Sequence, residues 1–116
     1  MPGDVYEIND IEQFKAFINT HRFVVVKITA TWCGPCKKAE PILRSEFQTM
    51  GNNVYLVYVD ADKGTAIKRA FRIKTVPTFA SIIDGELCDI YPTSSKEGIG
   101  EFFVKMRERV LNAMGN

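Results

Sequence analysis

The sequence predicts an α/β fold in which helices flank a mixed central β-sheet on both faces. Apolar runs rich in β-branched residues alternate along the chain with segments whose apolar residues recur every three or four positions. Crossover helices between strands require those strands to be parallel. Asp84-Gly85 joins two further strand-like runs and predicts a two-residue hairpin, which adds an antiparallel pair at one edge. The expected order of elements is therefore αβαβαββα.

The first helix is expected at about residues 10–20 and the first strand at residues 23–29. Asn9 as N-cap, with Glu12 at the third helical position, is typical of a capping box. The apolar residues that follow at helical spacing are Ile11, Phe14 and Ile18. Residues 23–29 are mostly β-branched and almost all apolar, which predicts a central strand covered on both faces.

The later elements follow from the same patterns. A second helix is expected to begin at residues 33–36 and to continue past Pro41, which should kink it. Its apolar side is Ala39, Ile42, Leu43, Phe47 and Met50. A buried strand at 54–59, a short helix marked by Ile67, Ala70 and Phe71, and hairpin strands at 78–83 and 86–91 come next. The last helix is expected at about 95–111, with apolar residues Ile99, Phe102, Phe103, Met106 and Val110.

Length and composition limit the function classes. A chain of 116 residues suits one domain, residues 1–116, and its 46% hydrophobic and 25% charged residues are typical of a globular protein. Fifteen basic and fourteen acidic residues create no field that favours nucleic acid or an anionic membrane. The first twenty residues lack the apolar stretch of a signal peptide, and three cysteines are too few for a disulfide scaffold. We therefore expect a monomer in the reducing cytoplasm, with neither nucleic acid nor membrane as partner.

The segment Trp32-Cys33-Gly34-Pro35-Cys36 carries the chemistry of the chain. Two cysteines with two residues between them can form a reversible disulfide where the chain turns sharply, and Gly34 and Pro35 permit that turn. A helix that begins here directs free N–H groups at Cys33 and favours its reactive thiolate. A structural disulfide, half of a zinc site and two inert core cysteines are the alternatives. The apolar run before the motif and the helical pattern after it favour the redox interpretation.

Several segments resemble the thioredoxin family. The run 24–26 that leads into residues 30–37 is similar to that family's active-site segment, and residues 59–62 are similar to the strand end that follows it. Val76-Pro77-Thr78 matches the family's cis-proline segment, and Asp84-Gly85-Glu86 matches its hairpin. The resemblance covers about residues 5–112. It implies the thioredoxin fold and a thiol–disulfide oxidoreductase that reduces protein disulfides.

The dithiol chemistry agrees with this resemblance. Cys33 as thiolate would attack a substrate disulfide, and Cys36 would then attack Cys33 to release the reduced substrate. Trp32 offers a flat apolar surface beside the nucleophile. No bound cofactor is expected, and a separate reductase of the thioredoxin-reductase type would recharge the protein, because the chain has no room for a flavin or nicotinamide domain.

Substrate binding is assigned to two loops. By resemblance, the Val76–Pro77 peptide bond is cis and presents the Val76 backbone to an extended substrate segment, with Thr75 beside it. Without the resemblance, Val76-Pro77 would be interpreted as the end of a loop before a strand. Thr93 stands where the family usually has glycine, in a loop that borders the active site, so partner choice is expected to differ.

Lys27 is the main departure from the family, which usually carries a buried aspartate six residues before the first active-site cysteine. In a central strand Lys27 should point under the active site, where a cation or a neutral amine replaces the carboxylate. The alternative is that Lys27 extends to the surface and has no chemical role. The family's companion lysine on the next strand corresponds to Leu56.

The remaining polar and sulfur residues are given ordinary roles. Lys37, Lys38 and Glu40 are expected to form a solvated helix face. Cys88 is interpreted as a small buried apolar residue, with a regulatory or dimer-forming thiol as the alternative. His21 is expected to cap the first helix at its C-terminus. A zinc site of four Cys and His ligands would need every such residue in the chain, and is not expected.

Two further functions compete with a disulfide reductase. An oxidant or isomerase is favoured if Lys27 stabilises the thiolate and raises the reduction potential. A non-catalytic binding module would use the same face of the cysteine motif, including Trp32 and the Val76-Pro77 surface, to dock a partner.

Overall fold

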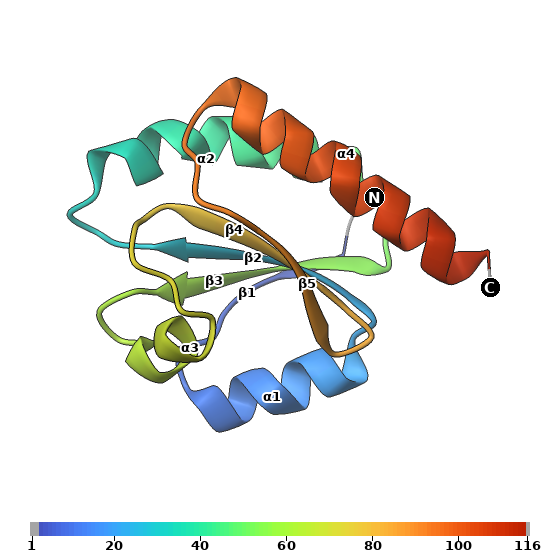
Figure 1. The fold of residues 1–116 in the computed structure, drawn as a ribbon, viewed down its shortest axis with the longest axis horizontal. Helices are drawn as coiled ribbons and strands as arrows, with labels where there is room; N and C mark the ends of the chain where they lie inside the picture. The colour runs from blue at the N-terminus through green and yellow to red at the C-terminus, as the bar shows by residue number, and fades with distance from the viewer. Residues whose placement is uncertain (1–2, 116) are drawn as a thin grey trace.

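A five-stranded mixed sheet lies at the centre of the protein. The structure is a computed structural model that describes residues 3–115. In chain order its elements are β1 (Val5–Glu7), α1 (Ile11–Thr20), β2 (Phe23–Thr29), α2 (Gly34–Phe47), β3 (Val54–Asp60), α3 (Thr65–Ala70), β4 (Thr78–Ile83), β5 (Glu86–Tyr91) and α4 (Lys96–Met114). Helices α1 and α3 cover one face of the sheet, and α2 and α4 cover the other (Figure 1). The predicted α/β architecture is confirmed.

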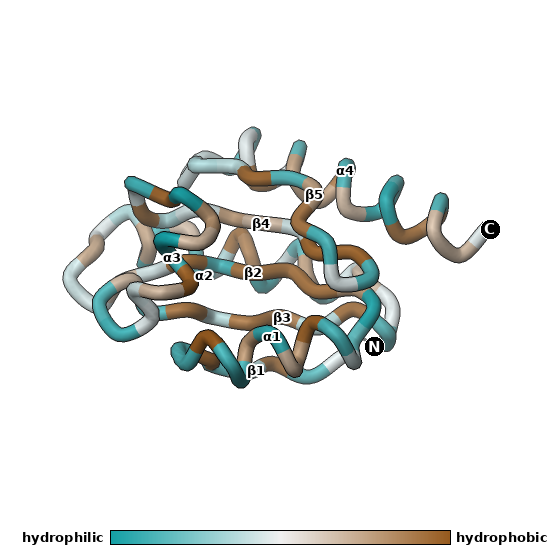
Figure 2. The backbone as a smooth tube through the Cα atoms, turned by 60° about the horizontal axis from the view of Figure 1, so that its bottom comes forward, coloured by the Kyte–Doolittle hydropathy of each residue, from teal (hydrophilic) through white to brown (hydrophobic). Residues whose placement is uncertain are grey.

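The strand order β1-β3-β2-β4-β5 puts β2 in the middle of the sheet. β2 is parallel to β3 and antiparallel to β4, and β4 and β5 form the expected hairpin. Side chains of β2 alternate between two cores. Val24 and Val26 pack with residues of α1 and α3, whereas Phe23 and Val25 pack with residues of α2 and α4. The apolar stretches of β2 and β3 are visible in Figure 2. Burial on both faces explains why residues 23–29 lack a polar face.

The predicted order of elements is wrong at the N-terminus, where the structure begins with the strand β1. Val5, Tyr6 and Glu7 pair in parallel with Leu56, Val57 and Tyr58 of β3. All three side chains of β1 are exposed, so the segment shows no apolar alternation. Pairing of its backbone with β3, and not burial of its side chains, holds this strand in the sheet.

The N-cap of α1 is Asp10 and not Asn9. The Asp10 carboxylate accepts the backbone N–H of Gln13 at 2.9 Å, and Glu12 lies in the first turn. The Asn9 side chain instead accepts the backbone N–H of Asp60 at 2.8 Å and donates to Glu7 at 2.9 Å. Both residues are good caps, and Asn9 is occupied in joining the end of β1 to the end of β3.

The cap at the end of α1 and the turn between β4 and β5 agree with the sequence expectations. His21 caps the C-terminus of α1 through its backbone N–H, and its ring stacks on Phe17. Asp84 and Gly85 have positive φ angles of 50° and 82°, as a tight hairpin turn requires.

Two residues differ from the sequence expectations. Met50 lies beyond the end of α2 yet is buried in the core. Cys88 is a free, half-buried thiol on β5 and is less buried than expected. Within residues 3–115 no helix combines the length and apolarity needed to cross a bilayer.

Candidate redox-active site

The two cysteines of the motif lie where the loop after β2 enters α2. Cys33 is the N-cap of α2, Pro35 lies in the first turn, and Cys33 and Cys36 form a disulfide with Cα atoms 5.3 Å apart. Pro35 fits because its missing N–H removes no helical hydrogen bond there. A Cβ added to Gly34 would meet no atom within 4 Å, so the turn does not need glycine for space.

The N-terminus of α2 surrounds Cys33 with positive potential. The backbone N–H of Cys36 donates to the Cys33 sulfur at 3.1 Å. The helix dipole adds to this hydrogen bond, and both favour a thiolate at Cys33 once the disulfide is reduced. Cys33 and Cys36 are 3% and 2% exposed, so exposure does not distinguish them. The two cysteines differ in position, because Cys33 caps the helix whereas Cys36 lies inside its first turn.

Two backbone segments and one aromatic side chain border the disulfide. Trp32 is 68% exposed, and its ring N–H donates to the Asp62 carboxylate at 2.9 Å. The Val76–Pro77 peptide bond is cis, and the Cys33 sulfur lies 3.7 Å from the carbonyl oxygen of Val76. The structure therefore brings Trp32, Cys33 and Val76 to one surface. Asp62, which orients the tryptophan ring, was missed because nothing in its sequence position links it to Trp32.

The loop after β5 lies beside the loop before β4. Thr75 and Pro92 line a hollow of about 220 Å³ together with residues of the α3–β4 connection. Thr75 also accepts a hydrogen bond from the Thr78 hydroxyl through its carbonyl oxygen, at 2.7 Å. The side chain of Thr93 turns toward α4, where its hydroxyl accepts the backbone N–H of Ser95 at 3.2 Å.

Thr93 makes Gly98 of α4 sensitive to substitution. A Cβ added to Gly98 would lie 2.1 Å from the Thr93 hydroxyl oxygen and 2.8 Å from its Cβ. Gly98→Ala is therefore expected to lower the free energy of unfolding by about 1–3 kcal/mol, as measured by urea denaturation. Gly100→Ala is the matched control on the same helix, because its Cβ would meet only the Glu46 carboxylate at 3.9 Å. Helix propensity should make that control neutral or stabilising. Equal losses in the two variants would contradict the clash.

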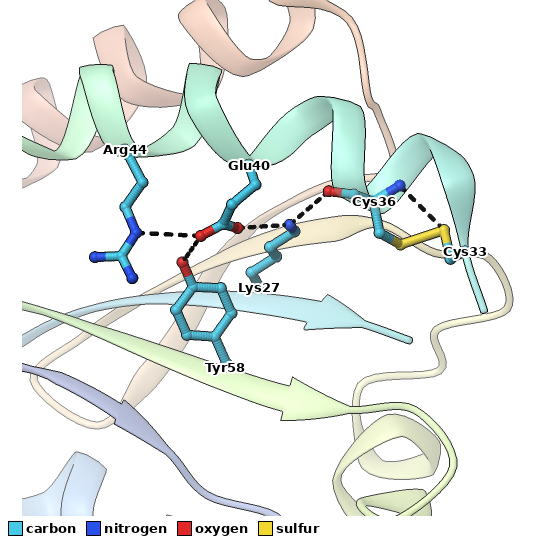
Figure 3. Close-up of polar contacts among 6 residues, drawn as sticks. All are labelled: Lys27, Cys33, Cys36, Glu40, Arg44 and Tyr58. Carbon is cyan, nitrogen blue, oxygen red and sulfur yellow. Dashed lines mark hydrogen bonds and ion pairs between the residues drawn. A yellow bond between two sulfur atoms is a disulfide. The ribbon is translucent and has the colours of Figure 1, made fainter. Parts of the chain in front are cut away.

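Lys27 lies beneath the active site, buried between β2 and α2 (Figure 3). Its side chain is 2% exposed, so the alternative of a lysine that extends to the surface is wrong. Nζ donates to the backbone carbonyl of Cys36 at 2.9 Å and to the Glu40 carboxylate at 2.9 Å. The alternation along β2 explains this position, because Lys27 shares the face of Phe23 and Val25, which packs against α2 and α4.

Glu40 is the centre of this buried network. One carboxylate oxygen accepts from Lys27, and the other accepts from the Tyr58 hydroxyl and from Arg44 at 3.1 Å. Burial alone would raise the pKa of Glu40, but hydrogen bonds from Tyr58 and Lys27 and the charge of Lys27 outweigh it and hold that pKa below its usual value. Burial and the hydrogen bond to Glu40 raise the pKa of Tyr58. The carboxylate is therefore ionised and Tyr58 neutral near pH 7.

One sequence expectation about this region is wrong. Glu40 does not belong to a solvated helix face, since it forms an ion pair with buried Lys27. On β3, Tyr58 lies opposite Lys27, and Leu56 lies opposite Val25. The sequence did contain a sign of the network. Cys36, Glu40 and Arg44 are spaced at four residues and so share one face of α2.

A cavity of about 430 Å³ opens beside the network. Cys36, Lys27, Glu40, Tyr58 and Asp60 are among the residues that line it. The cavity therefore adjoins the second cysteine and the buried charges. Across residues 3–115, no group of three or more His, Cys, Asp or Glu side chains could hold a metal ion.

Comparisons with known proteins point to one family. The family model described as Thioredoxin matches residues 5–105. Thioredoxin H-type 1 from Nicotiana tabacum is 33% identical over 107 residues, which cover 89% of this chain and 84% of that protein. Thioredoxin-2 from Pyricularia oryzae is 33% identical over 85 residues, which cover 73% of this chain but only 49% of the relative. The chain thus spans about half the length of that relative.

Solved structures agree with the sequence comparisons. The crystal structure of Malassezia sympodialis thioredoxin superposes with a TM-score of 0.79 at 27% identity. The superposition covers 91% of this chain and 94% of the other.

Proposed function

The chain belongs to the thioredoxin family, and we propose that it reduces disulfide bonds of protein substrates through reversible oxidation of Cys33 and Cys36. The family match and a cysteine pair at disulfide distance support thiol–disulfide oxidoreductase activity. The observation that carries the proposal is the disulfide at the N-terminus of α2, next to exposed Trp32 and the Val76 carbonyl. This surface offers a reactive sulfur, an apolar platform and a backbone carbonyl to one substrate segment.

The position of Cys33 at the helix N-terminus and of Cys36 inside the first turn supports a different role for each thiol. In the reduced protein, the Cys33 thiolate attacks one sulfur of the substrate disulfide, and the other substrate sulfur leaves as a thiolate. The Cys36 thiol then loses its proton and attacks Cys33, which closes the Cys33–Cys36 disulfide and releases the second substrate thiolate. Two electrons pass from the cysteine pair to the substrate. Trp32, Thr75, Val76 and Thr93 are proposed to contact the substrate chain.

The proposal extends to the partners and the setting of the protein. A separate reductase of the thioredoxin-reductase type would regenerate the dithiol, because repeated turnover needs an electron source. We place the protein in the cytoplasm as a single-domain monomer that serves electron transport and redox homeostasis. Three cysteines in a chain of 116 residues are too few for a disulfide scaffold, which supports a reducing compartment.

The reduction potential tests the direction of the reaction. We expect a reduction potential of about −270 mV, which is typical of thioredoxins, as measured by equilibration with a glutathione or dithiothreitol buffer. A potential of about −180 mV, which is typical of protein disulfide isomerase, would instead indicate an oxidant or isomerase. The Lys27 ammonium favours this second function because it stabilises thiolates.

A binding function without catalysis gives a different result. A double variant with Cys33→Ser and Cys36→Ser should abolish the reduction of insulin disulfides. A binding module would keep its partner and its cellular effect in the same double variant.

A further inference from the structure

The buried lysine is fixed against the backbone of the second cysteine. Lys27 has two hydrogen-bond acceptors at 2.9 Å, the carbonyl oxygen of Cys36 and the carboxylate of Glu40. Its Nζ also lies 5.9 Å from the centre of the Tyr58 ring. Figure 3 shows that these groups approach the ammonium from α2 and β3. A cation with 2% exposure is stable only when such partners replace its water.

We propose that Glu40 is a positioning residue that holds the Lys27 ammonium beside Cys36, where the fixed positive charge favours the thiolate that resolves the mixed disulfide. The inference rests on the proposed function and deepens it, because it names what promotes the second chemical step. An opposite charge close to a thiol favours its ionised form. The carboxylate that the family carries on the strand is thus replaced by a cation on β2, and its counter-ion comes from α2.

Glu40 itself is poorly suited to remove the thiol proton. Its two oxygens already accept hydrogen bonds from Lys27, Tyr58 and Arg44, and these donors make the carboxylate a weak base.

The other charged residues around the cavity do not replace Lys27. Glu7 accepts from the side chain of Asn9, and Asp60 accepts the backbone N–H groups of Asp62 and Lys63. The exposed Lys37 lies at the cavity wall and adds a second, solvated positive charge. Arg44 binds Glu40 from the far side, away from Cys36.

The step is complete without any further reactant. In the mixed disulfide, Cys36 loses its proton to solvent in the adjoining cavity. Its thiolate attacks the Cys33 sulfur, a bond forms between the two cysteines, and the bond from Cys33 to the substrate breaks. The substrate sulfur leaves with the electron pair as a thiolate and takes up a proton from solvent. Lys27 takes no part in the transfer of this proton and acts only through its charge.

Titration of Cys36 tests the role of the pair. In a background with Cys33→Ser and Cys88→Ser, Cys36 is the only thiol, and its ionisation is followed by the ultraviolet absorbance of the thiolate. Lys27→Met keeps the apolar stem and should raise the Cys36 pKa by roughly one unit, a tenfold loss of thiolate at pH 7. Glu40→Gln should raise it as well, because without its counter-ion the buried amine is driven to the neutral form. The combined variant should match Lys27→Met alone.

A single-turnover reaction separates this inference from the proposed function. With Cys33 restored, the reduced protein is mixed with the disulfide reagent dithiobis(nitrobenzoate). One thionitrobenzoate should be released as Cys33 attacks the reagent, and a second as Cys36 resolves the mixed disulfide on Cys33. We expect the second release to be about tenfold slower in Lys27→Met and slowed in Glu40→Gln at pH 7. Loss of the first release in the unsubstituted protein would overturn the proposed function and the inference together.

Glu46→Gln is the matched control. Glu46 lies on the same helix, has 31% side-chain exposure against 36% for Glu40, and pairs with Arg107 at 3.1 Å. Its substitution should leave the Cys36 pKa and the second release unchanged. A normal first release with an unchanged second release in both Lys27→Met and Glu40→Gln would overturn the inference alone. A lowered Cys36 pKa in Glu40→Gln would also overturn it, since Glu40 would then merely screen the lysine.

Discussion

Replacing Cys36 by serine is expected to convert the protein into a covalent trap for its substrates. Cys33 keeps its place at the helix N-terminus, with the backbone N–H of residue 36 still directed at its sulfur. It can attack a substrate disulfide, but no second thiol follows at the position from which the mixed disulfide is resolved. Catalytic reduction should fall by several orders of magnitude while mixed disulfides accumulate. Non-reducing electrophoresis and mass spectrometry of the linked peptides measure this accumulation.

The reciprocal variant is the control for this assignment. Cys33→Ser should lose the same catalytic activity yet trap almost no substrate, because Cys36 lies inside the first turn and is only 2% exposed. Both variants should carry Cys88→Ser, since Cys88 is a free, half-buried thiol that could itself form adducts. Equal trapping through Cys33 and Cys36 would contradict their separate roles.

Replacing Lys27 by aspartate is expected to destabilise the native state strongly. The substitution removes the cation that pairs with Glu40 at 2.9 Å and puts a second carboxylate into the same buried space. Loss of one partner of a buried ion pair costs about 3–5 kcal/mol, and repulsion between like charges adds to it. Chemical denaturation should therefore show a loss of at least about 3 kcal/mol in the free energy of unfolding at pH 7. The loss should shrink at acidic pH, where the two acids become neutral.

A charge exchange tests whether the pair, and not the lysine alone, provides this stability. Lys27→Asp combined with Glu40→Lys should recover part of the loss, because opposite charges again face each other between β2 and α2. Lys15→Asp is the surface control, since Lys15 is 60% exposed and pairs with exposed Glu12 at 3.6 Å. Its effect should stay within about 0.5 kcal/mol. If the double variant were no more stable than Lys27→Asp, the pairing would not be the cause.

The structure also changes how the effect of Lys27→Asp on the reduction potential is interpreted. From the sequence, an aspartate at this position should lower the reduction potential, because a negative charge disfavours the thiolate form. In the structure, Glu40 already supplies a carboxylate to the same space. Lys27→Met is therefore the cleaner probe of potential, since it removes one charge without adding its opposite.

Elements buried on both faces were the easiest to predict from the sequence. β2 matches residues 23–29 because both of its faces pack into a core, so its apolar run has clear ends. The hairpin at Asp84-Gly85 followed from turn chemistry that few residue pairs satisfy. β1 could not be found in this way, because three exposed residues carry no periodic pattern.

Residues of the candidate site that depend on local sequence could likewise be predicted, whereas contacts made by tertiary packing could not. Cys33 and Cys36 lie in a short motif whose chemistry depends on local spacing, so the sequence could identify them. Pro77 was identified through the family resemblance. Lys27 stood out as a charge within an apolar strand, but its partner depends on which face of α2 lies over β2. The pairing of Glu40 with Lys27 therefore became visible only when the helix was placed on the sheet. Asp62 met Trp32 for a similar reason, through the packing of two loops.

The burial of the two sulfurs ties the reducing power of the protein to its folding. Cys33 and Cys36 belong to the apolar core that also contains Val26 and Ile28 of the central strand. A thermodynamic cycle connects the oxidised and reduced forms in their folded and unfolded states. Any difference in unfolding free energy between the two redox forms must then equal a difference in potential between the folded and unfolded chain, about 30 mV for each 1.4 kcal/mol. Core residues remote from the sulfurs thereby become determinants of the electron affinity of the disulfide, whenever their packing discriminates between the two redox forms.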